Sequence, residues 1–188
     1  MKSLESSSVI YRKLEAFIKK YYTNELIRGI LFFIGLGLLY FLFTLFVEYF
    51  LWLKPIARTV LFWTFVFVEF FLLFRFILFP LFRLFKLQRG IDYKEASAII
   101  GNHFSEVSDK LTNFLQLSED ENQSELLAAS IEQKANALQP IPFGNAVNFK
   151  ANKKFLPLAI LPILFFAFFY LSGNSTIISQ SLNRVVHF

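Results

Sequence analysis

The chain has 188 residues, of which 55% are hydrophobic and 27 are Phe, and this composition excludes an ordinary soluble domain of its size. It contains no Cys, which excludes disulfides and thiolate metal sites. The net charge of +5 comes mostly from Lys and Arg beside apolar segments, an arrangement that indicates membrane topology rather than nucleic-acid binding.

Residues 1–27 are predicted to form an amphipathic helix. Apolar side chains recur at alternating steps of four and three residues along one face: Ile10, Leu14, Phe17 and Tyr21. The basic side chains on the opposite face are Arg12, Lys13, Lys19 and Lys20. Two interpretations fit this pattern. The helix lies in the anionic surface of the inner leaflet, or its apolar face packs on the rest of the protein.

Residues 28–86 are predicted to form a hairpin of two transmembrane helices, with spans at 29–48 and 59–83. The 19 uncharged residues before Glu48, at about 1.5 Å each, nearly cross a hydrocarbon core of about 30 Å. Lys54-Pro55 supplies the turn between the spans. We expect Phe side chains of the second span to fill the notches that small residues leave in the first, at Gly29, Gly35 and Gly37.

Residues 87–154 are predicted to be a soluble insert of three short helices followed by a connector. The first helix begins at Asp92, with Glu95 three residues later in a capping-box pattern. The second begins at Ser105 and the third at Ser124. The side chains expected to be buried in this insert are Ala96, Ile99, Ile100, Val107, Leu111, Phe114, Leu115, Leu127, Ile131 and Leu138.

The connector and the C-terminal part are marked by prolines. Pro140 and Pro142 prevent a long helix, so the connector back to the membrane is predicted to be extended. Residues 155–171 form a third predicted span, in which Pro162 is expected to kink the helix. Residues 172–188 begin an external region with one apolar face, formed by Ile178, Leu182 and Val185.

The distribution of Lys and Arg predicts the orientation. Six of the 19 lie in residues 1–28 and nine in residues 83–154, whereas residues 48–58 hold two and residues 172–188 hold one. The positive-inside rule places the first two segments in the cytoplasm and the other two outside.

Three segments resemble the N-terminal region of large uncharacterised envelope proteins of Bacteroidota-type bacteria, the "domain of unknown function 4175" family: YYTNELIRG, EASAIIGNHFSEVSDKLTNFLQL and LLAASIEQKANALQPIPF. The likeness covers nearly all of the chain. It implies three N-terminal spans in an inner membrane, followed by a long periplasmic region, so that the 188 residues would be part of a longer protein. The family supplies no activity and no catalytic residues.

The second span contains two ionisable side chains, Glu69 and Arg75. An ionised carboxylate at the centre of a span costs at least a few kcal/mol, so Glu69 is predicted to be protonated, paired or turned toward a wet interior. Arg75 lies roughly 9 Å along the axis and about 120° around it, a poor position for pairing within one helix. It is expected to extend toward the cytoplasmic surface. The partners expected for Glu69 are Arg75 of another subunit, a backbone group, the Tyr40 hydroxyl group, or a bound ion or proton.

Two roles are open for Glu69. It fixes helix packing through a hydrogen bond, or it takes part in the movement of ions or protons. A proton relay usually needs a chain of titratable groups. The uncharged run before Glu48 and the third span hold no carboxylate and no His to form one, so the sequence favours the packing role.

The sequence therefore predicts an all-α integral membrane protein with three transmembrane helices, an amphipathic N-terminal helix and a small cytoplasmic helical insert. It contains no phosphate-binding glycine loop, no HExxH motif and no evident nucleophile–base pair, and the spans separate His103 from His187. We expect no enzymatic activity, no cofactor and no metal site in this part of the chain.

The predicted function is that of an anchor and assembly module in the bacterial inner membrane. Its expected partners are the lipid bilayer, other envelope proteins and further copies of itself, with no nucleic acid. The first alternative is an ion- or proton-coupled transport or energy-coupling subunit that uses Glu69. The second is that a region beyond residue 188 is enzymatic and is held in place by this one.

Overall fold

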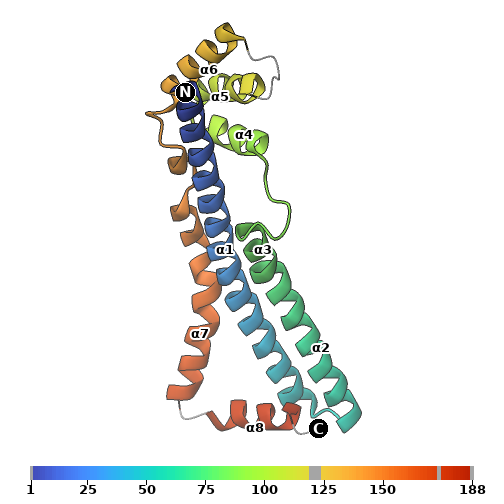
Figure 1. Cartoon of the computed structure of the whole chain (residues 1–188). Helices are drawn as coiled ribbons and strands as arrows, with labels where there is room; N and C mark the ends of the chain where they lie inside the picture. The colour runs from blue at the N-terminus through green and yellow to red at the C-terminus, as the bar shows by residue number, and fades with distance from the viewer. Residues whose placement is uncertain (1, 119–123, 173–174, 187–188) are drawn as a thin grey trace. The chain divides into compact units, whose positions relative to one another are not determined.

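The structure is a computed structural model that describes residues 2–118, 124–172 and 175–186, without the side chains of residues 2–5 and 175–178. Every regular element in these ranges is a helix (Figure 1). In chain order they are α1 (Lys2–Leu51), α2 (Pro55–Leu73), the π-helical turn η1 (Phe74–Leu78), α3 (Phe79–Leu84), α4 (Tyr93–His103), α5 (Ser105–Ser118), α6 (Glu125–Leu138), the 3-10 helices η2 (Phe143–Ala146) and η3 (Phe149–Phe155), α7 (Leu156–Leu171) and α8 (Ser175–Val186).

The chain divides into two compact units, which are described separately. Unit 1 contains Met1–Asn24 and Arg83–Phe149, and unit 2 contains Glu25–Phe82 and Lys150–Phe188. Helix α1 contributes residues to both units.

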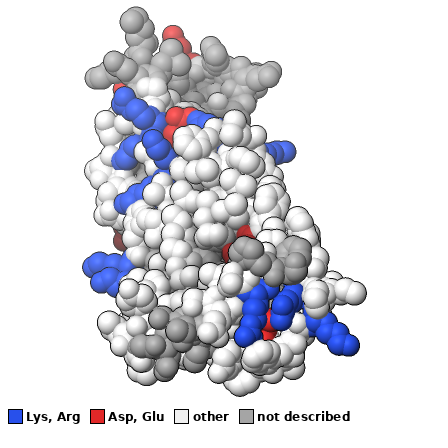
Figure 2. Space-filling view, turned by 90° about the horizontal axis from the view of Figure 1, so that it is seen from below, with Lys and Arg blue, Asp and Glu red and all other residues white. Residues whose placement is uncertain are grey.

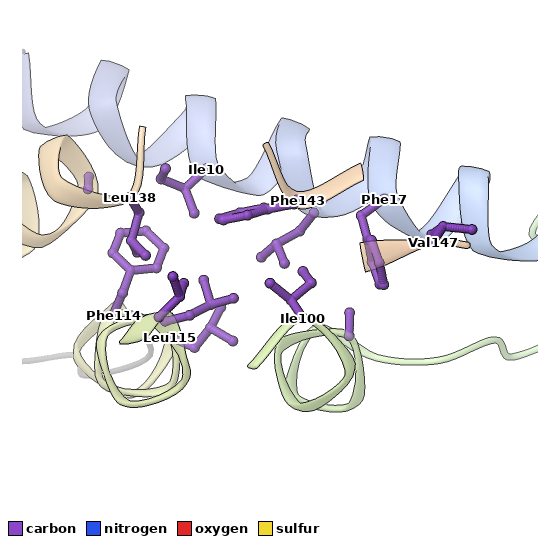
Figure 3. Packing of buried hydrophobic residues seen from close by; sticks show 13 residues of the cluster. Ile10, Phe17, Ile100, Phe114, Leu115, Leu138, Phe143 and Val147 are labelled. Atoms are coloured by element: carbon purple, nitrogen blue, oxygen red, sulfur yellow. The ribbon is translucent and has the colours of Figure 1, made fainter. Parts of the chain in front are cut away.

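The core of unit 1 lies where one face of α1 packs against the shorter helices. In Figure 3 the side chains of Ile10 and Phe17 project from α1 toward those of α4 and α5. The buried cluster comprises Ile10, Leu14, Phe17, Ala96, Ile100, Val107, Leu111, Phe114, Leu115, Ala135, Leu138, Phe143 and Val147. Each large side chain of this kind contributes about 1.5–3 kcal/mol through burial. The structure therefore supports the second interpretation of the apolar face of α1, in which this face packs on the rest of the protein.

The helix starts predicted in the insert are confirmed. The Asp92 side chain accepts a hydrogen bond of 2.7 Å from the Glu95 N–H, and the Glu95 side chain accepts one from the Asp92 N–H, which completes a capping box. The Ser124 hydroxyl accepts a hydrogen bond from the Leu127 N–H. Most side chains expected to be buried are buried, whereas three are only half-buried: Ile99, Leu127 and Ile131.

The connector after α6 is not extended, and that prediction is wrong. It forms η2 and η3 instead, and Phe143 and Val147 belong to the buried core. Pro140 and Pro142 do prevent an α-helix. A 3-10 turn is short enough to form between breaks in the helix, and the connector's apolar side chains complete the core beside α1 and α4.

Unit 2 is built from long apolar helices. Among the described residues, three helices are long and apolar enough to cross a membrane: Ser6–Leu51, Pro55–Leu84 and Phe143–Leu171. The predicted number of apolar spans is therefore confirmed. Many of their large side chains are exposed, including Trp63, Phe67, Phe70, Leu164 and Phe168. The end-on view in Figure 2 shows a mostly uncharged surface on which Lys and Arg gather in separate groups.

Aromatic rings connect the helices of unit 2. The ring of Phe41 in α1 lies 5.6 Å from that of Phe65 in α2 and 5.8 Å from that of Phe166 in α7. Phe32 in α1 similarly lies 4.7 Å from the ring of Phe155. Such ring pairs add about 0.5–1.5 kcal/mol each to the contribution of buried area.

The expectation that Phe rings fill the glycine notches of α1 is wrong at all three glycines. Gly29 lies against the backbone carbonyl of Phe76, and Gly35 lies against Leu158 of α7. At Gly37 the neighbouring group is the carboxylate of Glu69. The missing Cβ atoms thus admit backbone and polar groups.

The second long helix contains a π-helical turn, η1, that was not predicted. At the end of η1 the Phe79 N–H bonds to the Phe74 carbonyl, five residues back. Pro80 follows directly, and its ring lacks the N–H that an α-helix would direct to the Phe76 carbonyl. A π-bulge is a common response where the regular ladder of hydrogen bonds is interrupted.

Helix α8 packs against α2 and α7 and runs across the ends of the long helices of unit 2 (Figure 1). Its buried side chains are Ser181 and Val185, one turn apart, while Leu182 is 38% exposed. The predicted apolar face is therefore wrong at Leu182. The side chain of Ile178 lies outside the described residues.

Candidate functional site

The carboxylate of Glu69 lies in a notch between α2 and α1. A Cβ atom at residue 37 would stand 2.9 Å from Glu69 Oε2, so the carboxylate lies directly against this glycine. The side chain is half-buried. Within the described part of the chain no hydrogen bond or ion pair engages it. Glu69 is thus a carboxylate that packs against backbone without a partner of its own.

The other two intramembrane candidates do not join Glu69. Arg75 is exposed on η1, with its guanidinium group 5.8 Å from the ring of Phe76 and 5.7 Å from that of Phe79. The Tyr40 ring stacks on Phe65 at 6.0 Å. No hydrogen bond from its hydroxyl group to Glu69 occurs among the described residues, so this expected pairing is not realised. The three candidates do not form one site.

A buried charge pair lies at the end of unit 2 where α1 turns into α2. Glu48, in the last turn of α1, is 0% exposed, and its Oε1 lies 2.9 Å from Nε of Arg58 in the first turns of α2. Neither Glu48 oxygen has a hydrogen bond within the described part of the chain, so the pair is held by charge without hydrogen-bond geometry. Both residues were predicted to lie at the ends of the outer loop of residues 48–58, and their pairing was not predicted.

Other buried polar side chains lie in the same unit as this pair. Thr44, one turn before Glu48, is buried, and its hydroxyl group donates to the Tyr40 carbonyl at 3.0 Å. Ser181 of α8 is buried in the same unit. The Arg184 guanidinium group lies 4.0 Å from the ring of Trp52. Helix α8 thereby covers the end of unit 2 that contains the charged pair.

Two of the four basic residues on the polar face of α1 bind backbone carbonyls in unit 1. Lys13 Nζ lies 2.7 Å from the Gln139 carbonyl and 2.5 Å from the Ile141 carbonyl, at the C-terminal end of α6. Lys20 Nζ donates to the Gly144 carbonyl at 2.8 Å. Burial lowers the pKa of Lys13. Both ammonium groups bind the connector to α1, in agreement with the interpretation in which this helix packs on the rest of the protein.

The remaining two basic residues, Arg12 and Lys19, line a cavity of about 720 Å³ in unit 1. The cavity opens between α1 and the segment of residues 83–93, which supplies Arg83, Lys86 and Arg89. On the basic face of α1, Lys13 and Lys20 therefore bind backbone carbonyls, whereas Arg12 and Lys19 line the cavity.

Among the described residues, no group of His, Cys, Asp or Glu is arranged to hold a metal ion. The ring of His103 packs edge-on against Phe104 at 4.7 Å, and His187 lies outside the described residues. Comparisons of the chain with family models, with curated proteins and with solved structures gave no match. The resemblance to the envelope-protein family accordingly stays a prediction.

Proposed function

We propose that the chain is a non-catalytic membrane anchor and assembly module of a larger envelope protein or complex. Unit 2 would hold the chain in the bilayer, and unit 1 would be the cytoplasmic part that meets partners or further copies of the chain.

The observation that carries this proposal is the exposure of apolar side chains along the long helices of unit 2. Phe67 is 72% exposed, Phe168 67% and Trp63 61%. Soluble monomers rarely expose contiguous apolar patches larger than a few hundred Å². A bilayer provides an environment for such a surface, and helices satisfy their backbone groups internally, as a hydrocarbon solvent requires.

Helix α1 supports the combination of anchoring with assembly. Its first turns supply Ile10, Leu14 and Phe17 to the core of unit 1, and its later turns belong to the apolar part of unit 2. One continuous element thus contributes to both parts. Loss of this helix would remove the anchor and the core of unit 1 together.

The proposed location is the bacterial inner membrane, with the N-terminus and residues 83–154 in the cytoplasm. The distribution of Lys and Arg supports this orientation, and the resemblance to Bacteroidota envelope proteins supports the choice of membrane. Trp52 and Tyr49 are exposed at the opposite end of the first span, where an interfacial aromatic belt is expected. Helix α8 would then lie on the periplasmic side.

Labelling of single cysteines tests the orientation, and the absence of native Cys removes background. Thr112 of α5 and Gln180 of α8 are both exposed. In intact spheroplasts an impermeant maleimide is expected to label Gln180→Cys, and to label Thr112→Cys only after permeabilisation. Labelling of Thr112→Cys in intact spheroplasts, or release of the chain from membranes by alkaline carbonate, would overturn the proposal.

The assembly role is tested by extraction of the full chain in a mild detergent, followed by size-exclusion chromatography with light scattering and by identification of co-purifying proteins. The expected result is a stable complex with envelope proteins or with further copies. A monodisperse monomer that brings no partner at several detergent concentrations contradicts it.

The second candidate function is ion- or proton-coupled transport through Glu69. The observation that favours it is the carboxylate beside Gly37, which no described group engages. A carboxylate in a span is a functional-site hypothesis by default. The carboxylate of Glu48 does not supply a second step for a proton relay, because it is buried and already paired with Arg58.

A further inference from the structure

The cavity of unit 1 combines cationic groups with apolar walls. Its volume of about 720 Å³ is within the range of small-molecule sites. The five basic residues in its lining are Arg12, Lys19, Arg83, Lys86 and Arg89. Two carboxylates, those of Glu15 and Asp92, lie in the same lining. The lining therefore has an excess of positive charge.

The two carboxylates are already engaged. Glu15 Oε1 accepts a hydrogen bond of 3.0 Å from Lys86 Nζ and one of 3.4 Å from the Tyr93 hydroxyl. The pKa of Lys86 is raised, chiefly by this hydrogen bond and by the charge of Glu15. The Asp92 carboxylate accepts the Glu95 N–H as the cap of α4. Neither carboxylate is placed to neutralise the other basic groups.

Three of the cations have no such partner. Within the described residues no hydrogen bond or ion pair engages the side chain of Arg12, Lys19 or Arg89. Like charges gathered in one concave surface raise its potential and favour an anion there. Arginine in particular suits the planar, bidentate contacts that phosphate oxygens offer.

The floor of the cavity is built by close packing. Tyr22 is 1% exposed, and its hydroxyl oxygen accepts the Ile91 N–H at 2.6 Å. A Cβ atom at Gly90 would stand 2.9 Å from that oxygen, so glycine permits the close approach. The backbone at Lys86 is left-handed, with φ of 57°, and the Lys86 N–H bonds to the Arg83 carbonyl at 3.2 Å. The segment that carries three of the cations is thus fixed by a tight turn and a buried tyrosine.

Apolar side chains adjoin the cations. Leu84 and Leu87 line the cavity, and Leu87 and Phe85 are 74% and 65% exposed. Arg83 is the last residue of the second predicted span and directly follows Phe82 of unit 2. A ligand with a charged head and an apolar remainder would satisfy both kinds of surface.

We propose that this cavity is a binding site for a phosphate-bearing anion, with Arg12, Lys19 and Arg89 as the side chains that contact the phosphate. The phosphate would belong to the headgroup of an anionic phospholipid or to a soluble phosphorylated molecule. Basic clusters immediately cytoplasmic of a span are suited to the first source. This site goes beyond the proposed anchor role. Binding of a soluble phosphorylated molecule there does not depend on the orientation of the chain in the membrane.

The test uses the full chain in detergent and two matched double variants. Arg12→Gln/Arg89→Gln removes two proposed contacts, whereas Lys110→Gln/Lys134→Gln removes the same charge from helices of unit 1 outside the cavity lining. Native mass spectrometry measures binding of dioleoylphosphatidylglycerol against dioleoylphosphatidylcholine. Calorimetric titration measures binding of glycerol 3-phosphate and of inorganic phosphate.

The proposal predicts that the first variant binds the anionic probe about 100-fold more weakly, since each charged contact contributes about tenfold, and that the second variant binds within about threefold of the unchanged chain. Binding of phosphatidylglycerol alone identifies a lipid site, and binding of glycerol 3-phosphate as well identifies a soluble phosphate ligand. Equal losses in the two variants, or no binding of any probe, overturn the proposal.

A gain of binding provides a check that loss of folding cannot imitate. Glu15→Gln removes a negative charge from the lining, and it should tighten binding of the anionic probe by about two- to fivefold. Unchanged or weaker binding by this variant, with an unchanged thermal transition, also overturns the proposal.

Discussion

The backbone carbonyl of Phe76 occupies the place that a Cβ atom of residue 29 would take, so Gly29 brings α1 into backbone contact with η1. Pro80 makes this carbonyl unusual, because the residue four positions after Phe76 has no N–H to donate. A carbonyl this close to a glycine is in a position to accept a Cα–H···O contact, and such contacts are worth about 0.5–1 kcal/mol. Gly29 and Pro80 are therefore two parts of one packing arrangement.

Gly29→Ala is expected to destabilise unit 2 by about 1–3 kcal/mol, as overpacking does in a rigid site. The sign is informative, because the same change elsewhere in a helix stabilises by about 1 kcal/mol. Thermal unfolding in detergent, followed by circular dichroism, measures the difference.

Gly37→Ala is the matched control for that change. Its new methyl group would meet the carboxylate of Glu69, the mobile end of a side chain rather than backbone. We expect a smaller loss than at Gly29. A Gly29→Ala protein as stable as the unchanged chain would show that the close contact between α1 and η1 does not form.

The Glu48–Arg58 pair predicts an asymmetric response to mutation. Arg58→Met leaves a fully buried carboxylate without its cation and should cost about 3 kcal/mol or more. Adding Glu48→Gln should restore much of that loss, since the double variant no longer buries an unpaired charge. The measurement is a double-mutant cycle of unfolding in mixed micelles. Additive losses in the cycle would mean that the two groups do not interact.

Lys13 is expected to stabilise unit 1. Its ammonium group contacts three carbonyls at the end of α6, those of Leu138, Gln139 and Ile141. Lys13→Met keeps the aliphatic part and removes the donors, with an expected loss of about 2 kcal/mol in the free energy of unfolding. Lys110→Met, at an exposed position on α5, is the control and should change it by less than about 0.5 kcal/mol. Equal effects of the two changes would contradict the capping role.

The pH dependence of Lys13 has a defined sign. Burial lowers its pKa in the folded state below the usual 10.5, so the folded protein holds this proton less tightly than the unfolded chain. The free energy of unfolding contributed through this group should therefore rise as the pH increases through the window just below 10.5. The difference between the unchanged chain and Lys13→Met, measured at about pH 8 and about pH 10, should grow at the higher pH. A difference that shrinks there contradicts this assignment.

The sequence was most informative where a signal is local. Capping at Asp92 and Ser124 and the apolar spacing of α5 predicted unit 1 closely, because caps and helical faces depend on residues three or four positions apart. Lys13 and Lys20 could not be assigned in this way. Their partners are backbone carbonyls more than 120 positions away, and a carbonyl has no signature in the sequence.

Two features of unit 2 did have signals. Glu48 and Arg58 lie on either side of the predicted turn at Lys54-Pro55, so pairing positions across the hairpin would have suggested the ion pair. Pro80 inside a long apolar helix indicated an interruption, and the structure has η1 directly before it. The groups that lie against Gly29, Gly35 and Gly37 had no such signal, because they depend on how three helices pack together.

Glu69→Gln separates the anchor function from the transport function. The amide keeps the shape and most of the hydrogen-bonding capacity of the carboxylate but cannot carry a proton. If the chain is an anchor, this variant should insert, co-purify with the same partners and complement a strain that lacks the gene as well as the unchanged chain does.

The control for this change is Glu69→Leu, which removes the polar group altogether. It tests packing in the notch beside Gly37. An anchor should tolerate Glu69→Gln fully and lose some stability with the bulkier leucine, because the notch admits a flat carboxylate more easily than a branched side chain. A Glu69→Gln protein that inserts and assembles normally but fails to complement would refute the anchor-only function. Proton flux in proteoliposomes, abolished by the same variant, would then identify Glu69 as the coupling group.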